Sequence, residues 1–126
     1  MNIKERVKQR KLDFTGEVLT GYDFSGMNLE GAIFRNANLE GAIFTNANLW
    51  RAVFAGANLK GALMMFAGMR RADFSGADLT GADLFSATLT DANLTDANLK
   101  GANLRNAKLS EGEGKRRARL KGLIRR

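Results

Sequence analysis

A repeat of five residues runs through most of this chain of 126 residues and limits its fold more than any other feature. Every fifth position from residue 14 to residue 109 is Phe, Leu or Met, with no insertion or deletion. Two residues before each large residue, from Ala32 to Ala107, the residue is always alanine. The position between the two is mostly Asn or Asp, and small, polar or charged residues usually follow.

This period of five fits neither regular secondary structure, because a helix repeats every 3.6 residues and a strand every two. A helix would rotate the apolar stripe around its axis, and a strand would place alternate large residues on opposite faces. The chain must therefore turn once in each block of five. Gly, Asn, Asp and Ser in the turning positions supply the chemistry that turns require. The repeat predicts a solenoid with the alanine and the large residue inside.

A second period of ten residues lies within the first, because phenylalanine and leucine alternate at the large position from Phe24 to Leu59. If four blocks close one square coil of twenty residues, phenylalanine lines two opposite sides of the interior and leucine lines the other two. Large and smaller walls together can fill the interior at the density of a protein core. We therefore predict two interior columns, Phe14, Phe34, Phe54 and Phe74 in one and Leu19, Leu39, Leu59, Leu79 and Leu99 in the other.

One glycine recurs in every coil, at Gly21, Gly41, Gly61, Gly81 and Gly101. These residues predict a corner that carries no side chains along the rod. Such a corner would let another backbone approach closely.

The blocks "ANLEG", "ANLKG", "ADLTG" and "ANLRN" resemble the pattern A-(D/N)-L-X-X of the pentapeptide-repeat family, and the similarity covers about residues 12 to 111. The resemblance implies an all-β solenoid, a right-handed quadrilateral β-helix of about five coils. It also implies that three of the five positions in each block point outward. The first coil is atypical, because Glu17, Tyr22 and Met27 stand where later coils have alanine.

The two ends of the chain are basic, although the repeats between them are mildly acidic. Of the net charge of +7, residues 1–11 contribute +4, residues 112–126 contribute +6 and residues 12–111 contribute −3. We therefore divide the chain into a basic N-terminal cap (1–11), a β-helix (12–111) and a basic C-terminal tail (112–126). The position of clustered cations, more than their total, decides affinity for phosphates.

Both ends also carry apolar residues at helical spacing. In the N-terminal cap, Ile3 and Val7 predict a short helix over Phe14 and Leu19. Solenoid ends need caps, because each end exposes core and unpaired backbone groups. The C-terminal tail could cap its own rod, pair with a second chain, or lie on an anionic surface. Its apolar face, if the tail is helical, consists of Leu120, Leu123 and Ile124.

Catalytic and metal-binding residue types are scarce in this sequence. It contains no histidine and no cysteine, so a serine nucleophile has no histidine base and no His/Cys metal site can form. Asp73, Asp78 and Asp83 would diverge on successive sides of one coil. We expect no enzyme activity, no catalytic residue, no cofactor, no metal and no small-molecule substrate. Without a long apolar run or a signal peptide, we expect a cytoplasmic location.

Outward positions between residues 43 and 85 depart from the polar pattern of the repeat. Five apolar residues, which we call the apolar stripe, fall on one side and its following corner: Ile43, Leu63, Met65, Phe66 and Phe85. One tryptophan and two arginines, which we call the Trp–Arg corner, fall on the next side round: Trp50, Arg70 and Arg71. Aromatic residues and arginine together are enriched where proteins bind proteins. A tolerated surface is the other interpretation, with Arg70 stacked over Trp50 and Arg71 paired with Asp91.

The leading functional interpretation is therefore a non-catalytic interaction or structural module. It binds a protein partner, or itself as a homodimer, through the apolar stripe and the Trp–Arg corner. One alternative comes from the resemblance, because some pentapeptide-repeat proteins imitate DNA and protect type II topoisomerases from quinolones or inhibit them. That role favours a long, strongly acidic rod, whereas residues 12–111 carry only −3. A second alternative is contact with nucleic acid or membrane through the basic ends.

Overall fold

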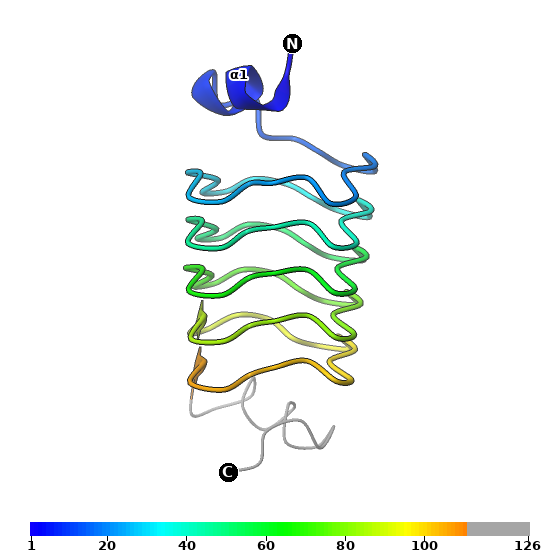
Figure 1. Ribbon diagram of the computed structural model, residues 1–126, viewed down its shortest axis with the longest axis vertical. Helices are drawn as coiled ribbons and strands as arrows, with labels where there is room; N and C mark the ends of the chain where they lie inside the picture. The colour runs from blue at the N-terminus through cyan, green and yellow to red at the C-terminus, as the bar shows by residue number, and fades with distance from the viewer. Residues whose placement is uncertain (111–126) are drawn as a thin grey trace.

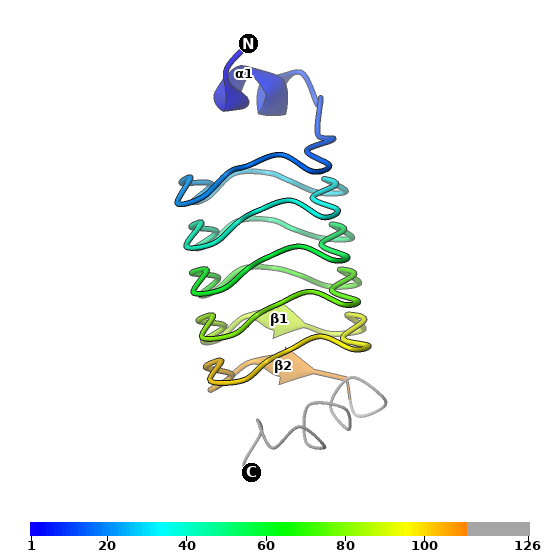
Figure 2. The same cartoon turned by 90° about the vertical axis from the view of Figure 1, so that its right-hand side faces the viewer.

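The computed structural model describes residues 1–110, which form a short helix and a stack of square coils. Helix α1 (Ile3–Lys8) lies at one end of the stack, as Figure 1 shows. Strands β1 (Thr88–Leu89) and β2 (Lys108–Leu109) lie on adjacent coils at the other end, where Figure 2 shows them in parallel. The remaining coils pair through isolated parallel bridges. The C-terminal residues Leu120, Leu123 and Ile124 lie outside the described part of the chain.

The coils stack in a register of twenty residues. Asp13 pairs with Ile33 and Ile33 with Val53, and the same offset recurs on the other sides of the stack. Strand β1 pairs with β2 in the same way, with Thr88 opposite Lys108. Because each coil contains four blocks, the rod has four sides, as the sequence predicts.

Each corner is a tight turn closed by a backbone hydrogen bond. In a typical block the amide of Ala37 donates to the carbonyl of Phe34 at 3.1 Å. Asn36, the residue before Ala37, has φ of 59°. A positive φ at the third residue of a hydrogen-bonded turn is the signature of type II. The same conformation recurs every five residues and explains why Gly and Asn are frequent there.

The interior consists of stacked side chains, as predicted. The ring of Phe34 lies parallel to the rings of Phe14 and Phe54, with centroids 5.0 and 5.1 Å apart. A second phenylalanine column faces the first, and its Phe44 meets Phe34 edge-on at 5.6 Å. The rings of both columns are fully buried. The leucine column is buried as well, at Leu19, Leu39, Leu59, Leu79 and Leu99.

The glycine corner has a different cause from the one that the sequence suggests. Gly61 has φ of 65°, and Gly21, Gly41, Gly81 and Gly101 lie in the same left-handed region. No atom approaches within 4 Å of the place where a Cβ at Gly61 would stand. Glycine is therefore favoured here by its backbone conformation and not by close approach of another chain segment.

Helix α1 begins at an N-cap, where the side chain of Asn2 accepts a hydrogen bond from the amide of Glu5 at 2.8 Å. Ile3 and Val7 are half-buried and pack against the interior cluster, which agrees with the helix predicted over the first coil. Arg10 donates to the carbonyl of Asn28 at 2.8 Å, so the helix end also satisfies a backbone group of the first coil.

Arg6 explains one irregularity of the first coil. Its guanidinium contacts the Glu17 carboxylate at 2.9 and 3.0 Å, donates to the carbonyl of Asp13, and lies 4.3 Å from the ring centroid of Phe14. Glu17 stands where later coils have alanine. It belongs to the first coil, and its carboxylate pairs with the N-terminal cap.

Candidate interaction surface

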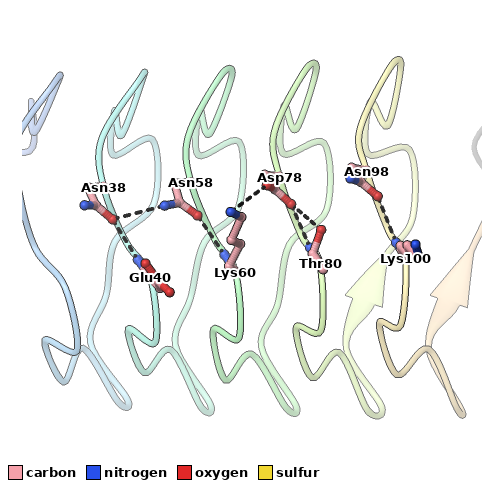
Figure 3. A network of polar contacts seen from close by, with 8 residues as sticks. All are labelled: Asn38, Glu40, Asn58, Lys60, Asp78, Thr80, Asn98 and Lys100. Atoms are coloured by element: carbon pink, nitrogen blue, oxygen red, sulfur yellow. Dashed lines mark hydrogen bonds and ion pairs between the residues drawn. The ribbon is translucent and has the colours of Figure 1, made fainter.

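The outward Asn and Asp residues of the repeat hold the turns by a local hydrogen bond. In one column, which Figure 3 shows, the Oδ1 of Asn38 accepts the amide of Glu40 at 3.2 Å. Neighbouring coils are linked as well, because Asn58 donates from Nδ2 to the Oδ1 of Asn38 at 3.4 Å. The same turn bond recurs in this column at Asn58, Asp78 and Asn98. This side is therefore a self-satisfied polar surface.

One carboxylate in this column has a clear electrostatic setting. The hydroxyl and amide of Thr80 donate to Asp78 Oδ1, and Lys60 Nζ lies 3.8 Å from Oδ2. The hydroxyl hydrogen bond is the main reason that the pKa of Asp78 lies below its usual value, and Lys60 adds to the effect. Since hydrogen bonds favour the charged form, Asp78 is an ionised structural group.

Within residues 1–110, no three acidic side chains gather in a way that could hold a metal ion. The three aspartates on successive sides, Asp73, Asp78 and Asp83, instead serve their own turns and accept amides at 2.9–3.1 Å. In the same range of residues, the one helix is too short to cross a bilayer.

The apolar stripe replaces this hydrogen-bonding pattern on another side. Ile43 and Leu63 pair across adjacent coils at positions where Asn or Asp usually stands. They have no side-chain acceptor, and the amides of Thr45 and Met65 find no acceptor among residues 1–110. The apolar residues therefore give up a turn-stabilising bond in two successive coils.

The structure brings the residues of the apolar stripe together. Leu63 lies between Ile43 and Asp83, and 36% of its surface is exposed. Phe66 is 54% exposed, and its ring meets that of Phe85 edge-on at 5.7 Å. Ile43, Met65 and Phe85 are half-buried. The amide of Phe66 donates to the carbonyl of Phe85 at 3.0 Å, which joins the two coils.

The Trp–Arg corner lies on the next side, without the contacts that a self-satisfied surface would need. Trp50 is 43% exposed, and within residues 1–110 Arg70 does not stack on its ring. Arg71 and Arg70 have no carboxylate within 4.0 Å in the same range. Asp91 instead accepts a hydrogen bond from the Ser110 hydroxyl at 2.8 Å. The described structure therefore contains neither contact of the tolerated-surface interpretation.

Backbone conformation adds a feature that the sequence reasoning missed. Phe66, Arg51 and Arg71 have φ of 61°, 61° and 59°. This left-handed conformation costs an L-residue with a Cβ roughly 1–2 kcal/mol. At the corner that holds Phe66, other coils use Gly26, Asn46, Ser86 and Asn106. The signal was visible in the repeat, because a large ring interrupts a column of turn residues.

Comparison with known proteins identifies the repeat. The family model described as "Pentapeptide repeats" matches in eight copies, over residues 13–51, 32–65, 47–85 and 72–110. No curated protein matches the sequence.

Solved structures of similar proteins support the fold. A pentapeptide repeat protein from the Arabidopsis thaliana thylakoid lumen is 33% identical and covers 88% of this chain and 79% of its own, with a TM-score of 0.80. One from the cyanobacterium Cyanothece 51142 is 23% identical and covers 86% of this chain and 93% of its own, with a TM-score of 0.56. The predicted right-handed quadrilateral β-helix is confirmed by these neighbours. The chain belongs to the pentapeptide-repeat family.

Proposed function

We propose that this protein is a non-catalytic interaction module that binds a protein surface through the apolar stripe and the Trp–Arg corner. The observation that carries the proposal is the exposed ring of Phe66 on a left-handed backbone. Its ring is 54% exposed although its backbone has φ of 61°, a conformation that disfavours large side chains. A residue that costs stability and is not buried by its own chain is typical of a site kept for a partner.

Burial of the exposed apolar side chains can supply much of the free energy of binding. Full burial of a large apolar side chain contributes about 1.5–3 kcal/mol, so covering the exposed parts of Leu63, Phe66 and Trp50 supplies a substantial part of the free energy of association. That gain must exceed the loss of translational and rotational freedom. The clustering of aromatic rings with arginine matches the composition of interface centres.

The non-catalytic part of the proposal rests on the residue inventory and on packing. The sequence lacks histidine and cysteine, and stacked phenylalanine and leucine side chains fill the interior of the rod. Five of the aspartates on the coils hold their own turns by hydrogen bonds: Asp13, Asp23, Asp73, Asp78 and Asp83.

Sedimentation velocity tests the self-association form of this proposal. The wild-type chain is compared with a Met65→Asp, Phe85→Asp variant and with a matched Ile33→Asp, Val53→Asp variant, which alters the apolar pair on the opposite side. A dimer that is lost only in the first variant would place the symmetric contact at the apolar stripe. A dimer that survives in the first variant contradicts it.

If all three chains sediment as monomers, a different protein must be the partner. Cross-linking of the wild type and both variants in extracts of the host tests this form. A cross-linked product that the wild type and the Ile33→Asp, Val53→Asp variant form, and that the Met65→Asp, Phe85→Asp variant loses, supports the proposal. Equal amounts of the product from both variants would show that the partner does not bind through the apolar stripe.

A further inference from the structure

One side of the β-helix loses its column of turn-holding side chains at Gly68, and the next residue of the column, Thr88, holds no turn bond either among residues 1–110. Asn48 donates from Nδ2 to the Oδ1 of Asn28 at 3.0 Å and accepts the amide of Trp50 at 3.1 Å. The next residue in this column is Gly68, which pairs with Asn48 and Thr88 through the backbone. No atom lies within 4 Å of the place where a Cβ at Gly68 would stand. The space of one polar side chain is therefore open above Asn48.

A hydrogen-bond donor faces this space. In the two preceding coils, the amides two residues after the column, those of Glu30 and Trp50, donate to Asn28 and Asn48 at 3.3 and 3.1 Å. The corresponding amide belongs to Arg70, and it has no acceptor among residues 1–110. Because the backbone repeats its conformation, the Arg70 N–H points to where an Asn or Asp oxygen would lie.

Three arginine residues belong to the corner that follows this space. Arg70 and Arg71 follow Gly68 at the corner, and the amide of Arg51 donates to the carbonyl of Arg70 at 2.9 Å, so Arg51 lies on the adjacent coil. All three arginines are exposed, and none has a carboxylate within 4.0 Å among residues 1–110. On the opposite edge of this side, two residues before Gly68, stands the exposed ring of Phe66.

We propose that the space at Gly68 receives a carboxylate side chain from an acidic, partly apolar segment of a partner protein. The carboxylate accepts the Arg70 N–H and pairs with the surrounding guanidiniums, while apolar residues next to it cover Phe66 and Leu63. This inference rests on the proposed function and specifies the chemistry of the partner. Charge-assisted hydrogen bonds from arginine to carboxylate are stronger than neutral ones and fix orientation.

The chain itself shows that a carboxylate fits such a space. At the equivalent place on the neighbouring side, Asp83 Oδ1 accepts the amide of Phe85 at 3.1 Å. A partner's Asp or Glu at Gly68 would make the same bond from outside. The site differs from the internal case because Arg51, Arg70 and Arg71 have no carboxylate partner of their own in residues 1–110.

The surroundings favour an acidic protein segment over a nucleic acid. Glu30 lies one coil before Trp50, and Asp91 lies one coil after Arg71, so acidic residues flank the cationic corner along the rod. The cationic part is about two coils long, roughly 10 Å at the spacing of paired strands. A nucleic acid would need a longer track of cations to neutralise several phosphates. One or two carboxylates match a spot of this size.

Amide NMR of the 15N-labelled full chain tests the proposal with two peptides. The first probe is acetyl-Leu-Glu-Phe-Glu-amide, and its control is acetyl-Leu-Gln-Phe-Gln-amide, which has the same shape without the charge. At up to about 10 mM peptide, which detects weak binding, the Glu peptide is expected to shift the Arg70 amide resonance in a saturable manner. The Gln peptide is expected to leave it unchanged.

Two matched variants separate the site from the rest of the surface. Gly68→Asn fills the space and supplies the missing acceptor, and it should fold normally because Gly68 does not need a positive φ. Val18→Asn adds the same side chain at the equivalent position on the opposite side, where Val18 is 75% exposed. The Arg70 shift should disappear in Gly68→Asn and persist in Val18→Asn.

The outcomes distinguish failure of this inference from failure of the proposed function. A shift of Arg70 that is equal for both peptides, or equal in Gly68→Asn and wild type, overturns the carboxylate site. No shift with either peptide overturns it as well. In each of these cases the apolar stripe is judged separately, because Gly68→Asn leaves Met65 and Phe85 intact and sedimentation still reports on them.

Discussion

The ring of Phe66 meets the ring of Phe85 edge-on, with centroids 5.7 Å apart and planes at 89°. This contact joins adjacent coils on the outside of the rod, where the repeat normally carries small polar residues. It half-buries Phe85, yet more than half of the Phe66 surface stays exposed. The pair therefore explains why Phe85 is tolerated, whereas Phe66 still lacks a partner for most of its ring.

Phe66→Asn should change the free energy of unfolding only slightly, because two effects oppose each other. The variant loses an aromatic contact of about 0.5–1.5 kcal/mol and relieves part of a left-handed backbone cost of roughly 1–2 kcal/mol. Urea unfolding measures the balance. The buried Phe54→Ala serves as the contrast, with an expected loss of about 3–5 kcal/mol. A loss above about 2 kcal/mol from Phe66→Asn would identify the ring as a structural element.

Gly61→Ala and Gly68→Ala should change stability in opposite directions. Both positions have open space for a Cβ, but only Gly61 has a positive φ, of 65°. The alanine at Gly61 should cost about 1 kcal/mol because of backbone strain. The alanine at Gly68 should stabilise by about 0.4–1 kcal/mol through the unfolded state. Thermal unfolding of the two variants measures the difference, and equal shifts would contradict a conformational origin of the glycine corner.

Asp78→Asn should remove part of the acid sensitivity of the fold. The pKa of Asp78 is lowered, first by the hydroxyl hydrogen bond from Thr80. A group with a lowered folded pKa stabilises the fold above its unfolded pKa of about 3.9, and this stability is lost as pH falls through the folded pKa. Asn at position 78 keeps the turn bond, as Asn38 and Asn58 do.

The measurement for Asp78 is the free energy of unfolding between pH 6 and pH 2, as roughly the range over which the carboxylate titrates. The variant should show a shallower fall than the wild type at the acid end. Thr80→Val is the companion variant, because it removes the hydroxyl and should move the pKa of Asp78 up toward its usual value. An unchanged carboxyl titration in Thr80→Val would contradict the assigned cause.

The periodic part of the fold could be predicted from the sequence because each interior position repeats one physical requirement. Phe34 and Phe54 stack because twenty residues separate them, and the alanines preserve that register through Met64 and Met69. The outward face is set by individual contacts. The pairing of Arg71 with Asp91, which the tolerated-surface interpretation predicts, is absent within residues 1–110, and Asp91 instead accepts a hydrogen bond from the hydroxyl of Ser110, a contact that no period encodes.

Part of the candidate site could be predicted from the sequence. The apolar stripe could be assembled by stacking the chain in twenties, since it depends only on register. The meaning of Gly68 could not, because the role of the outward Asn and Asp as acceptors for turn amides becomes visible only in the hydrogen bonds. Once that role is known, a glycine in the column indicates a missing acceptor at Arg70.

Arg6→Ala should loosen the first coil without unfolding the rod. The guanidinium makes a two-point contact with Glu17, donates to the Asp13 carbonyl and covers the ring of Phe14, while about a fifth of the Arg6 side chain and 38% of the Glu17 side chain stay exposed. After allowance for solvent screening, the loss should be about 1–2 kcal/mol. Because coils in a solenoid contact only their neighbours, hydrogen exchange should accelerate in the first coil and stay slow in the third.

Lys8→Ala, which changes an exposed residue of the same helix, is the control and should leave both exchange rates unchanged. Uniform acceleration along the rod in Arg6→Ala would show that the helix stabilises the whole stack, whereas no acceleration in the first coil would show that the contact with Glu17 does not secure the cap.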